Sequence, residues 1–266
     1  MTKLSFPGLN IDWFEINPIA FSIGNLSVHW YGVIIAFGFM LAILYCIKIK
    51  DYSNLTSDNI CDVALFGAPV GIICARLYYV IFSFSDYKDN LWDVFKIWEG
   101  GLAIYGGIIG AVLTAYIYCK VKNLSVAKVF DVCIIGVVIG QIIGRWGNFV
   151  NGEAYGAQTD VFWRMGIVEN GKEIFVHPTF FYESLWNLGV FIVLNIILRH
   201  RKFDGQVFLS YLLFYSLGRV WIEGLRSDSL YLGGLRVSQI LSLLLIIVSS
   251  FAIIYNITYK NKNKGL

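Results

Sequence analysis

The sequence predicts an all-α polytopic membrane protein with about seven transmembrane helices. The evidence is its apolar composition and the number of long apolar stretches. Of the 266 residues, 57% are hydrophobic and only 15% are charged, whereas a soluble domain usually carries about 25% charged residues. Aromatic residues make up 17%, an excess typical of proteins with aromatic belts at two membrane interfaces. The formal net charge of +3 is too small to indicate a nucleic-acid partner.

Seven stretches of the chain approach the roughly 20 mostly apolar residues that one span requires. The sixth is short and contains Arg219, so hydropathy supports it least. The expected spans are residues 28–49, 61–82, 101–119, 129–149, 179–198, 207–222 and 237–259.

Basic residues are distributed unequally between the two sets of loops that join these spans. One set is rich in lysine and arginine, and the other has fewer basic residues, diluted by acids. The positive-inside rule places the basic set in the cytoplasm, so the N-terminus is expected outside and the C-terminus inside. The basic set consists of Lys48, Lys50, Lys120, Lys122, Lys128, Arg199, Arg201, Lys202, Lys260, Lys262 and Lys264.

We expect a single membrane domain that covers residues 1–266. Two of its segments on the outer side are expected to be longer structures than turns. Residues 1–27 contain several aromatic side chains and are expected to form an N-terminal arm in the membrane interface. Residues 151–176 form a small extracytoplasmic insert. Asn170 and Gly171 lie between two apolar stretches there, and Asn-Gly predicts a β-hairpin.

Charged side chains inside spans are the strongest functional signal in this sequence. Each costs roughly 2.5–3.5 kcal/mol at the centre of a span on insertion scales, so such residues usually face the protein interior. Among them are Arg76, Arg145 and Arg219, with Arg226 just beyond the sixth span. A guanidinium can hold a phosphate through two hydrogen bonds. Snorkelling to the headgroups or pairing with buried acids is the alternative.

The fourth span ends in the run Gly144-Arg145-Trp146-Gly147-Asn148-Phe149-Val150-Asn151-Gly152-Glu153. The glycines allow a close approach of the backbone to a ligand. The amides Asn148 and Asn151 can donate to and accept from the hydroxyl groups of a glycerol headgroup. Glu153 can either accept from such a hydroxyl group or hold Arg145 in place.

Three other spans contribute candidate side chains. At the sixth span, Tyr215, Arg219, Glu223 and Arg226 are spaced by four, four and three residues, which places them on one helical face. Glu223 can therefore pair with Arg219 or Arg226. A satisfied ion network is the structural alternative for this face, and a place in an aromatic belt is the structural alternative for Tyr31. The further candidates are Tyr31 in the first span, His177, Tyr182 and Glu183 at the start of the fifth, and Tyr215, Arg219, Glu223 and Arg226 in the sixth.

These motifs resemble those of the prolipoprotein diacylglyceryl transferases of bacterial inner membranes. The resemblance covers nearly the whole chain, and the run from Arg145 to Glu153 is similar to the family signature Gly-Arg-x-Gly-Asn-Phe-x-Asn-x-Glu. It implies that phosphatidylglycerol donates its diacylglyceryl group to the lipobox cysteine of a prolipoprotein signal peptide. Glycerol phosphate would leave and a thioether would remain, in a site towards the outer leaflet.

The resemblance also implies roles for single residues. Arg145 matches the family's phosphatidylglycerol-binding arginine, and Arg219 matches a second essential arginine. Some members have histidine where this chain has Tyr105, and that histidine is favoured as the base that deprotonates the thiol. Tyrosine, with a pKa near 10, is a poor base at neutral pH.

Three accounts of thiol deprotonation therefore stay open: Tyr105 orients the thiol, another group is the base, or nearby charge stabilises the thiolate. We favour the third, because a thiol loses its proton more readily beside arginines. The same guanidinium groups can accept charge on the leaving phosphate. On this account no metal ion and no organic cofactor is required.

Two other functions fit parts of the pattern. A transporter for an anionic or lipid-like substrate would use buried arginines as an anion path, but the sequence shows no inverted repeat. A different lipid-headgroup transferase would share the phosphate site but would not need a cysteine-containing peptide.

Overall fold

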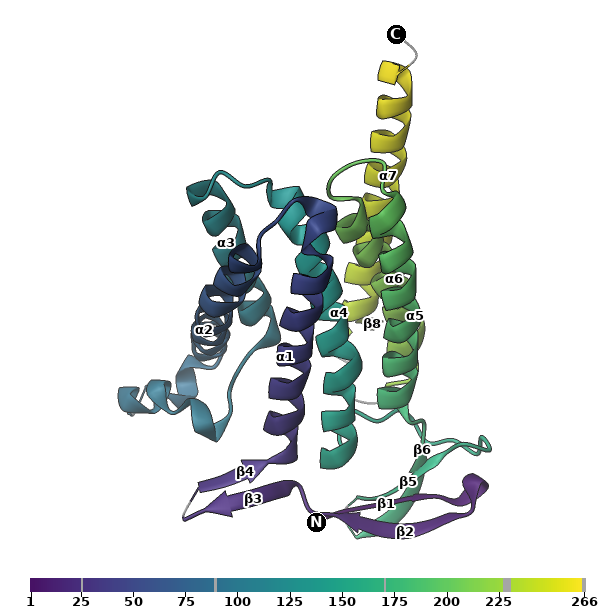
Figure 1. Cartoon of the computed structure of the whole chain (residues 1–266). Helices are drawn as coiled ribbons and strands as arrows, with labels where there is room; N and C mark the ends of the chain where they lie inside the picture. Colours follow the sequence, from purple (N-terminus) through teal and green to yellow (C-terminus); the bar gives the residue numbers. More distant parts are fainter. Residues whose placement is uncertain (25, 89, 170, 227–230, 265–266) are drawn as a thin grey trace. The chain divides into compact units, whose positions relative to one another are not determined.

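The computed structural model describes residues 1–24, 26–88, 90–169, 171–226 and 231–264. Within these ranges the chain is mostly helical, with seven helices of 18 residues or more (Figure 1). It forms two compact units, one made of Met1–Tyr45 and Ile134–Leu266 and the other of Cys46–Cys133. The single membrane domain expected from the sequence remains a prediction.

Six helices of the described chain are long and apolar enough to cross a membrane. They are α1 (Trp30–Ile49), α2 (Ser57–Phe82), α3 (Ile104–Val121), α4 (Val126–Asn151), α5 (Thr179–His200) and α7 (Val237–Lys264). The predicted sixth span lies in α6 (Gln206–Glu223), which is helical but carries Arg219 and Glu223. These helices support a multi-pass membrane protein, while a seventh crossing by α6 remains a prediction.

Local sequence explains where two of these helices begin. The helix α2 starts earlier than expected because Thr56 and Asn59 form a reciprocal capping box at its N-terminus. The helix α3 starts later than expected because Gly100 and Gly101 have φ angles of 94° and 70°. Such left-handed backbone cannot continue a right-handed helix and favours glycine.

Small residues bring helices together within each unit. In the second unit, α3 packs against α2, and Gly106 and Gly110 lie directly beside Cys74. In the first unit, Gly38 of α1 lies against Ile143 of α4. The helix α6 packs against both α5 and α7. Glycine at such contacts allows the close helix approach on which packing in lipid depends.

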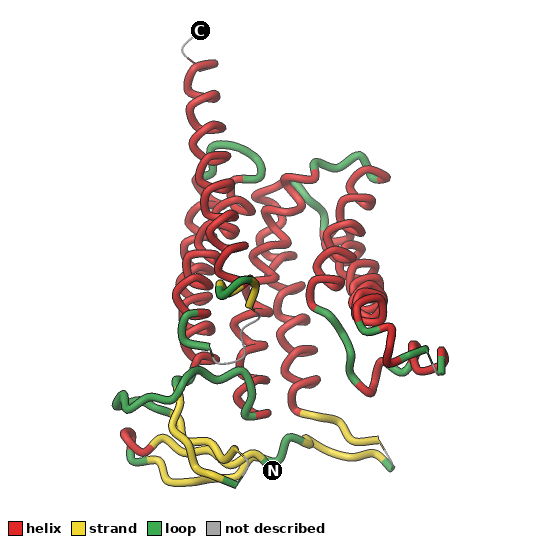
Figure 2. Tube along the Cα trace, turned by 180° about the vertical axis from the view of Figure 1, so that it is seen from behind, coloured by secondary structure: helices red, strands yellow, loops and turns green. Residues whose placement is uncertain are grey.

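The N-terminal arm and the insert form one antiparallel sheet, with strand order β2-β1-β5-β6. The strands are β1 (Thr2–Phe6), β2 (Ile11–Ile16), β5 (Met165–Glu169) and β6 (Lys172–Val176). Leu4 pairs with Phe14 on one side and with Ile167 on the other. Both views show the sheet beyond the N-terminal end of α5 (Figures 1 and 2).

This sheet corrects the all-α prediction, which included strands only in the insert. The pairing of β5 with β6 lies where the sequence predicts a hairpin, but its turn residue Asn170 lies outside the described residues. Strands in the N-terminal arm were not predicted. The sheet has a small apolar core made of Leu4, Met165, Ile167, Val176 and Phe180. Two further short ladders pair β3 (Ile19–Ile23) with β4 (Leu26–His29) and β7 (Tyr231–Leu232) with β8 (Leu235–Arg236).

Candidate functional site: an arginine cluster around Glu183

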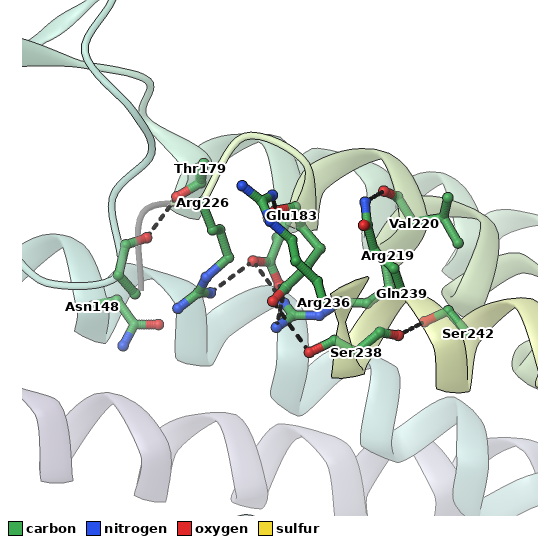
Figure 3. A network of polar contacts seen from close by, with 12 residues as sticks. Asn148, Thr179, Glu183, Arg219, Val220, Arg226, Arg236, Ser238, Gln239 and Ser242 are labelled. Carbon is green, nitrogen blue, oxygen red and sulfur yellow. Dashed lines mark hydrogen bonds and ion pairs between the residues drawn. The ribbon is translucent and has the colours of Figure 1, made fainter. Parts of the chain in front are cut away.

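Glu183 lies in the first turns of α5, and its carboxylate contacts three arginines from other parts of the first unit. Its side chain is only 5% exposed. Arg219 and Arg226 each place an Nη1 atom 3.2 Å from its Oε1 atom (Figure 3). Arg145 of α4 forms an ion pair with its Oε2 atom. One buried carboxylate therefore gathers three of the four arginines that the sequence indicates for a phosphate site.

A second carboxylate, that of Glu223, lies on the other side of Arg219. Its Oε2 atom is 2.6 Å from Arg219 Nη2, so one of the two pairings predicted for Glu223 is confirmed. The hydroxyl group of Ser238 donates to its Oε1 atom at 3.1 Å. Arg236 donates to the backbone carbonyl of Glu223. The start of α7 therefore completes this part of the cluster.

Arginines outnumber their carboxylate partners among the described residues of the cluster. Arg145, Arg219, Arg226 and Arg236 contribute four guanidinium groups, and Glu183 and Glu223 contribute two carboxylates. Guanidinium groups gathered in this way are what an anionic ligand would need. Charge-assisted hydrogen bonds from arginine to phosphate are among the strongest that side chains form.

Arg145 also links the cluster to the polar run that follows it. Its Nη1 atom donates to Asn148 Oδ1 at 3.3 Å. Asn148 and Asn151 in turn donate to Glu153 Oε1, at 2.9 Å and 3.4 Å. Glu153 is thus held by the two amides, and the carboxylate that contacts Arg145 directly is that of Glu183. A contact of Glu153 with a headgroup hydroxyl group stays a prediction.

Glu153 also lines an open cavity of about 630 Å³ next to the sheet. The cavity walls are Gly152, Glu153, Ala154, Tyr155, Gly156, Ala157, Gln158, Glu169, Ile174 and Val176. The same backbone segment helps to place Arg226, because the amide of Ala157 donates to the carbonyl of Leu225 at 2.7 Å. The insert thus fixes one of the cluster's arginines through main-chain hydrogen bonds.

Two of the predicted tyrosines of the first unit, Tyr215 and Tyr31, lie at different places. Tyr215 lines a small pocket that also includes Glu183 and Arg219, and its ring stacks on Tyr211 with the centroids 5.4 Å apart. Tyr31 lies in the first turn of α1, beside the backbone of Gly147. A Cβ atom at Gly147 would approach the Tyr31 ring to 2.7 Å, so glycine permits this contact.

His177 and Tyr182 form a hydrogen-bonded group beside the cluster. The indole of Trp163 donates to the Tyr182 hydroxyl group at 2.6 Å, and this hydroxyl group lies 3.2 Å from Nδ1 of His177. Burial lowers the pKa of His177 below its usual value, which favours the neutral ring. The group joins the insert to the first turn of α5, immediately before Glu183.

Tyr105 and Arg76 belong to the second unit and are described within it. Tyr105 is exposed in the first turn of α3. Arg76 is buried in α2 and donates to the backbone carbonyls of the segment that precedes α3. Roles for both at a phosphate site stay predictions. No group of three or more His, Cys, Asp or Glu residues that could hold a metal ion is found in the described ranges.

Reasoning from the sequence missed three features of the cluster. Glu183 was expected only as a supporting residue and is instead its centre. Arg236 and Ser238 were not considered. One signal was present: Arg236 directly precedes the N-terminus of α7, where the helix dipole disfavours a cation. An arginine in that position indicates a specific partner.

The apolar helices and the arginine cluster define a class of protein: a polytopic membrane protein with a buried cationic site. A family model described as prolipoprotein diacylglyceryl transferase matches residues 18–255. This chain belongs to the prolipoprotein diacylglyceryl transferase family, which confirms the resemblance found in the sequence.

Curated relatives agree with the family match. The chain is 45% identical to the phosphatidylglycerol–prolipoprotein diacylglyceryl transferase of Clostridioides difficile (strain 630), over 92% of this chain and 97% of the relative. It is 49% identical to the transferase of that name from Clostridium botulinum (strain Langeland), over 93% and 99%. Identity to the one from Listeria innocua is 48%, over 90% of each chain. The strands β1 and β2 precede the family match.

Proposed function

We propose that this chain transfers the diacylglyceryl group of phosphatidylglycerol to the thiol of a lipobox cysteine in a prolipoprotein signal peptide. The cysteine sulfur forms a bond to the glyceryl carbon, the bond from that carbon to the phosphate oxygen breaks, and glycerol phosphate leaves with the electron pair. The thiol proton is released. Family membership and the names of the relatives support this reaction.

The observation that carries the proposal is the gathering of Arg145, Arg219 and Arg226 on the carboxylate of Glu183. Arg145 and Arg219 hold the phosphodiester and accept the charge that grows on the departing phosphate, and Arg226 assists in binding. A guanidinium has five N–H donors, so contact with Glu183 leaves donors for a phosphate. Donors that are placed before reaction, and aimed where charge develops, are often the largest catalytic contribution.

The remaining predicted residues bind the lipid headgroup or shape the site. Asn148, Asn151 and Glu153 hold the glycerol hydroxyl groups, as their mutual hydrogen bonds at one edge of the cluster support. Glu223 orients Arg219 through the ion pair between them. Tyr31 and Tyr215 bind the lipid as well, and the proposed supporting side chains of the first unit are His177, Tyr182 and Glu183.

The reaction can be tested with purified protein, phosphatidylglycerol and a synthetic lipobox peptide. Mass spectrometry should show a diacylglyceryl adduct on the peptide and none on a peptide whose cysteine is replaced by serine. An adduct on both peptides would indicate a different acceptor and therefore another lipid-headgroup transferase. Absence of an adduct on either peptide would contradict the proposed reaction.

Tyr105→Phe is expected to retain measurable activity, because the arginines, and not the phenol, stabilise the thiolate. Tyr105→His should also be tolerated, since the family uses both residue types. The measurement is the initial rate of thioether formation across a range of pH. Complete loss in the phenylalanine variant, with phosphatidylglycerol binding unchanged, would instead assign proton transfer to the phenol.

We further propose that the protein lies in the bacterial cell membrane with the cluster towards the outer leaflet. Reporter fusions after Lys122, after Lys202 and at the C-terminus should then report the cytoplasm. Fusions in residues 86–90 and 170–172 should report the outside, because acids dilute the basic residues of those loops. A C-terminus on the outside would contradict a seven-span topology.

A further inference from the structure

The segment between α2 and α3 exposes an unusual number of large apolar side chains. We call residues 83–103 the aromatic loop. It contains three short 3₁₀ helices, Phe84–Asp86, Leu91–Phe95 and Ile97–Glu99. Leu91 is 60% exposed, Trp92 76%, Phe95 68% and Trp98 76%. Apolar groups gathered in this way mark a surface that contacts a partner or a membrane.

The aromatic loop continues the apolar surface of the two helices that it joins. Both helices are candidate membrane spans. At the end of α2, Ile81 and Phe82 are exposed, and at the start of α3 Ile104 is exposed as well. Apolar side chains that are exposed on a membrane span contact lipid. The loop therefore connects two helix ends whose exposed surfaces contact lipid. Tryptophan is enriched at this depth, where an apolar ring with one polar N–H suits the interface.

The loop also has a polar component that suits the headgroup region. Lys96 forms an ion pair with Asp93 at 2.6 Å, and both side chains are partly exposed. Asn90 donates to the carboxylate of Asp93 and caps the central 3₁₀ helix. Apolar rings beside partly solvated charges give the loop the amphipathic character of interfacial segments.

Arg76 of α2, which is only 6% exposed, stabilises the conformation of the loop. Its guanidinium donates to the carbonyls of Asp93 at 2.6 Å, Val94 at 2.8 Å, Lys96 at 3.4 Å, Gly100 at 2.7 Å and Gly101 at 3.1 Å. The ring of Tyr87 lies 5.1 Å from its central carbon. A single side chain thus satisfies five carbonyl groups in the second half of the loop, as a planar fork of donors allows.

We propose that the aromatic loop is a lipid anchor: Leu91, Trp92, Phe95 and Trp98 insert into the boundary between headgroups and acyl chains, and Arg76 holds the loop in the form that presents them. The occupant is bilayer lipid, because the apolar side chains continue the lipid-facing ends of α2 and α3. The anchor is independent of the transfer reaction. It holds the first turn of α3, which carries Tyr105, at the membrane interface.

Fluorescence quenching tests the insertion. The full-length protein and its Trp92→Phe/Trp98→Phe variant are placed one per nanodisc, and their difference isolates the signal of the two tryptophans. Lipids brominated in the upper part of the acyl chain should remove most of this signal, and aqueous iodide should leave it almost unchanged. Quenching by iodide alone would place the rings in water. Quenching by neither would mean that protein covers them. Either result would overturn the anchor.

A second measurement tests Arg76. In Arg76→Gln, hydrogen exchange of the loop amides should rise about tenfold or more, because several charge-assisted hydrogen bonds are lost. The quenching by brominated lipid should fall. Lys88→Gln, which removes an exposed cation of the same loop, is the matched control and should change neither. Unchanged exchange in Arg76→Gln would refute the holding role. Should that variant fail to fold, Arg76→Lys, which keeps the charge without the planar fork, should show the same direction of change.

Discussion

Replacing Arg145 by lysine is expected to remove nearly as much transfer activity as replacing it by alanine. A guanidinium can hold a phosphodiester through two parallel hydrogen bonds, and an ammonium group of the same charge cannot. Loss of one charge-assisted hydrogen bond costs about 1.5–3 kcal/mol, or roughly one to two decades in rate. Because charge also grows on the phosphate, we expect a loss of about 100-fold or more in the initial rate of thioether formation.

The contacts of Arg145 sharpen this prediction. It contacts Asn148 and Glu183 through different nitrogen atoms, a geometry that lysine cannot reproduce. Glu183 keeps Arg219 and Arg226 as partners when Arg145 is replaced, so the melting temperature in detergent should fall only slightly. Arg199→Lys, at the exposed opposite end of α5, should leave the rate unchanged. Wild-type activity in Arg145→Lys would show that charge alone matters, and a collapse in melting temperature would assign Arg145 to stability.

Glu183→Gln is expected to have the largest effect on stability. The amide keeps the size of the side chain but removes the negative charge that three arginines share. Breaking a buried ion pair by removing one partner typically costs about 3–5 kcal/mol, because the other charges remain buried and uncompensated. The melting temperature should fall markedly. Transfer activity should fall too, since repulsion displaces the guanidinium groups from the positions that hold the phosphate.

Two comparisons make the Glu183 result specific. Glu173→Gln, at an exposed position on β6, should leave the melting temperature unchanged. The double variant Glu183→Gln/Arg226→Gln removes one positive charge together with the negative one, so it should recover part of the lost melting temperature. If Glu183→Gln melts like the wild type, or if the double variant melts lower still, Glu183 is not the shared counter-charge of the cluster.

The apolar helices and the arginines within them could be predicted from the sequence because both depend on local properties. A helix in lipid satisfies its own backbone hydrogen bonds, so an apolar stretch of sufficient length is almost enough to specify it. Arginines within such stretches are visible for the same reason. The pairing of Arg219 with Glu223 also follows from local spacing, because residues four apart lie on one helical face. The pairing of β5 with β6 also lies where the sequence predicts it, whereas the exact starts of α2 and α3 depended on capping and left-handed glycines.

Only the tertiary structure decided how these parts combine. Glu183 is 36 positions from Arg219 and 43 positions from Arg226, and no periodicity links residues so far apart, so its central position follows from the packing of α4, α5 and α6. The pairing of Leu4 with Ile167, which joins the N-terminal arm to the insert, is equally remote in sequence. Arg76 shows most directly what the sequence alone does not determine. The sequence indicates that a buried arginine needs partners, but backbone carbonyls are present at every residue, and only the fold determines which of them the guanidinium reaches.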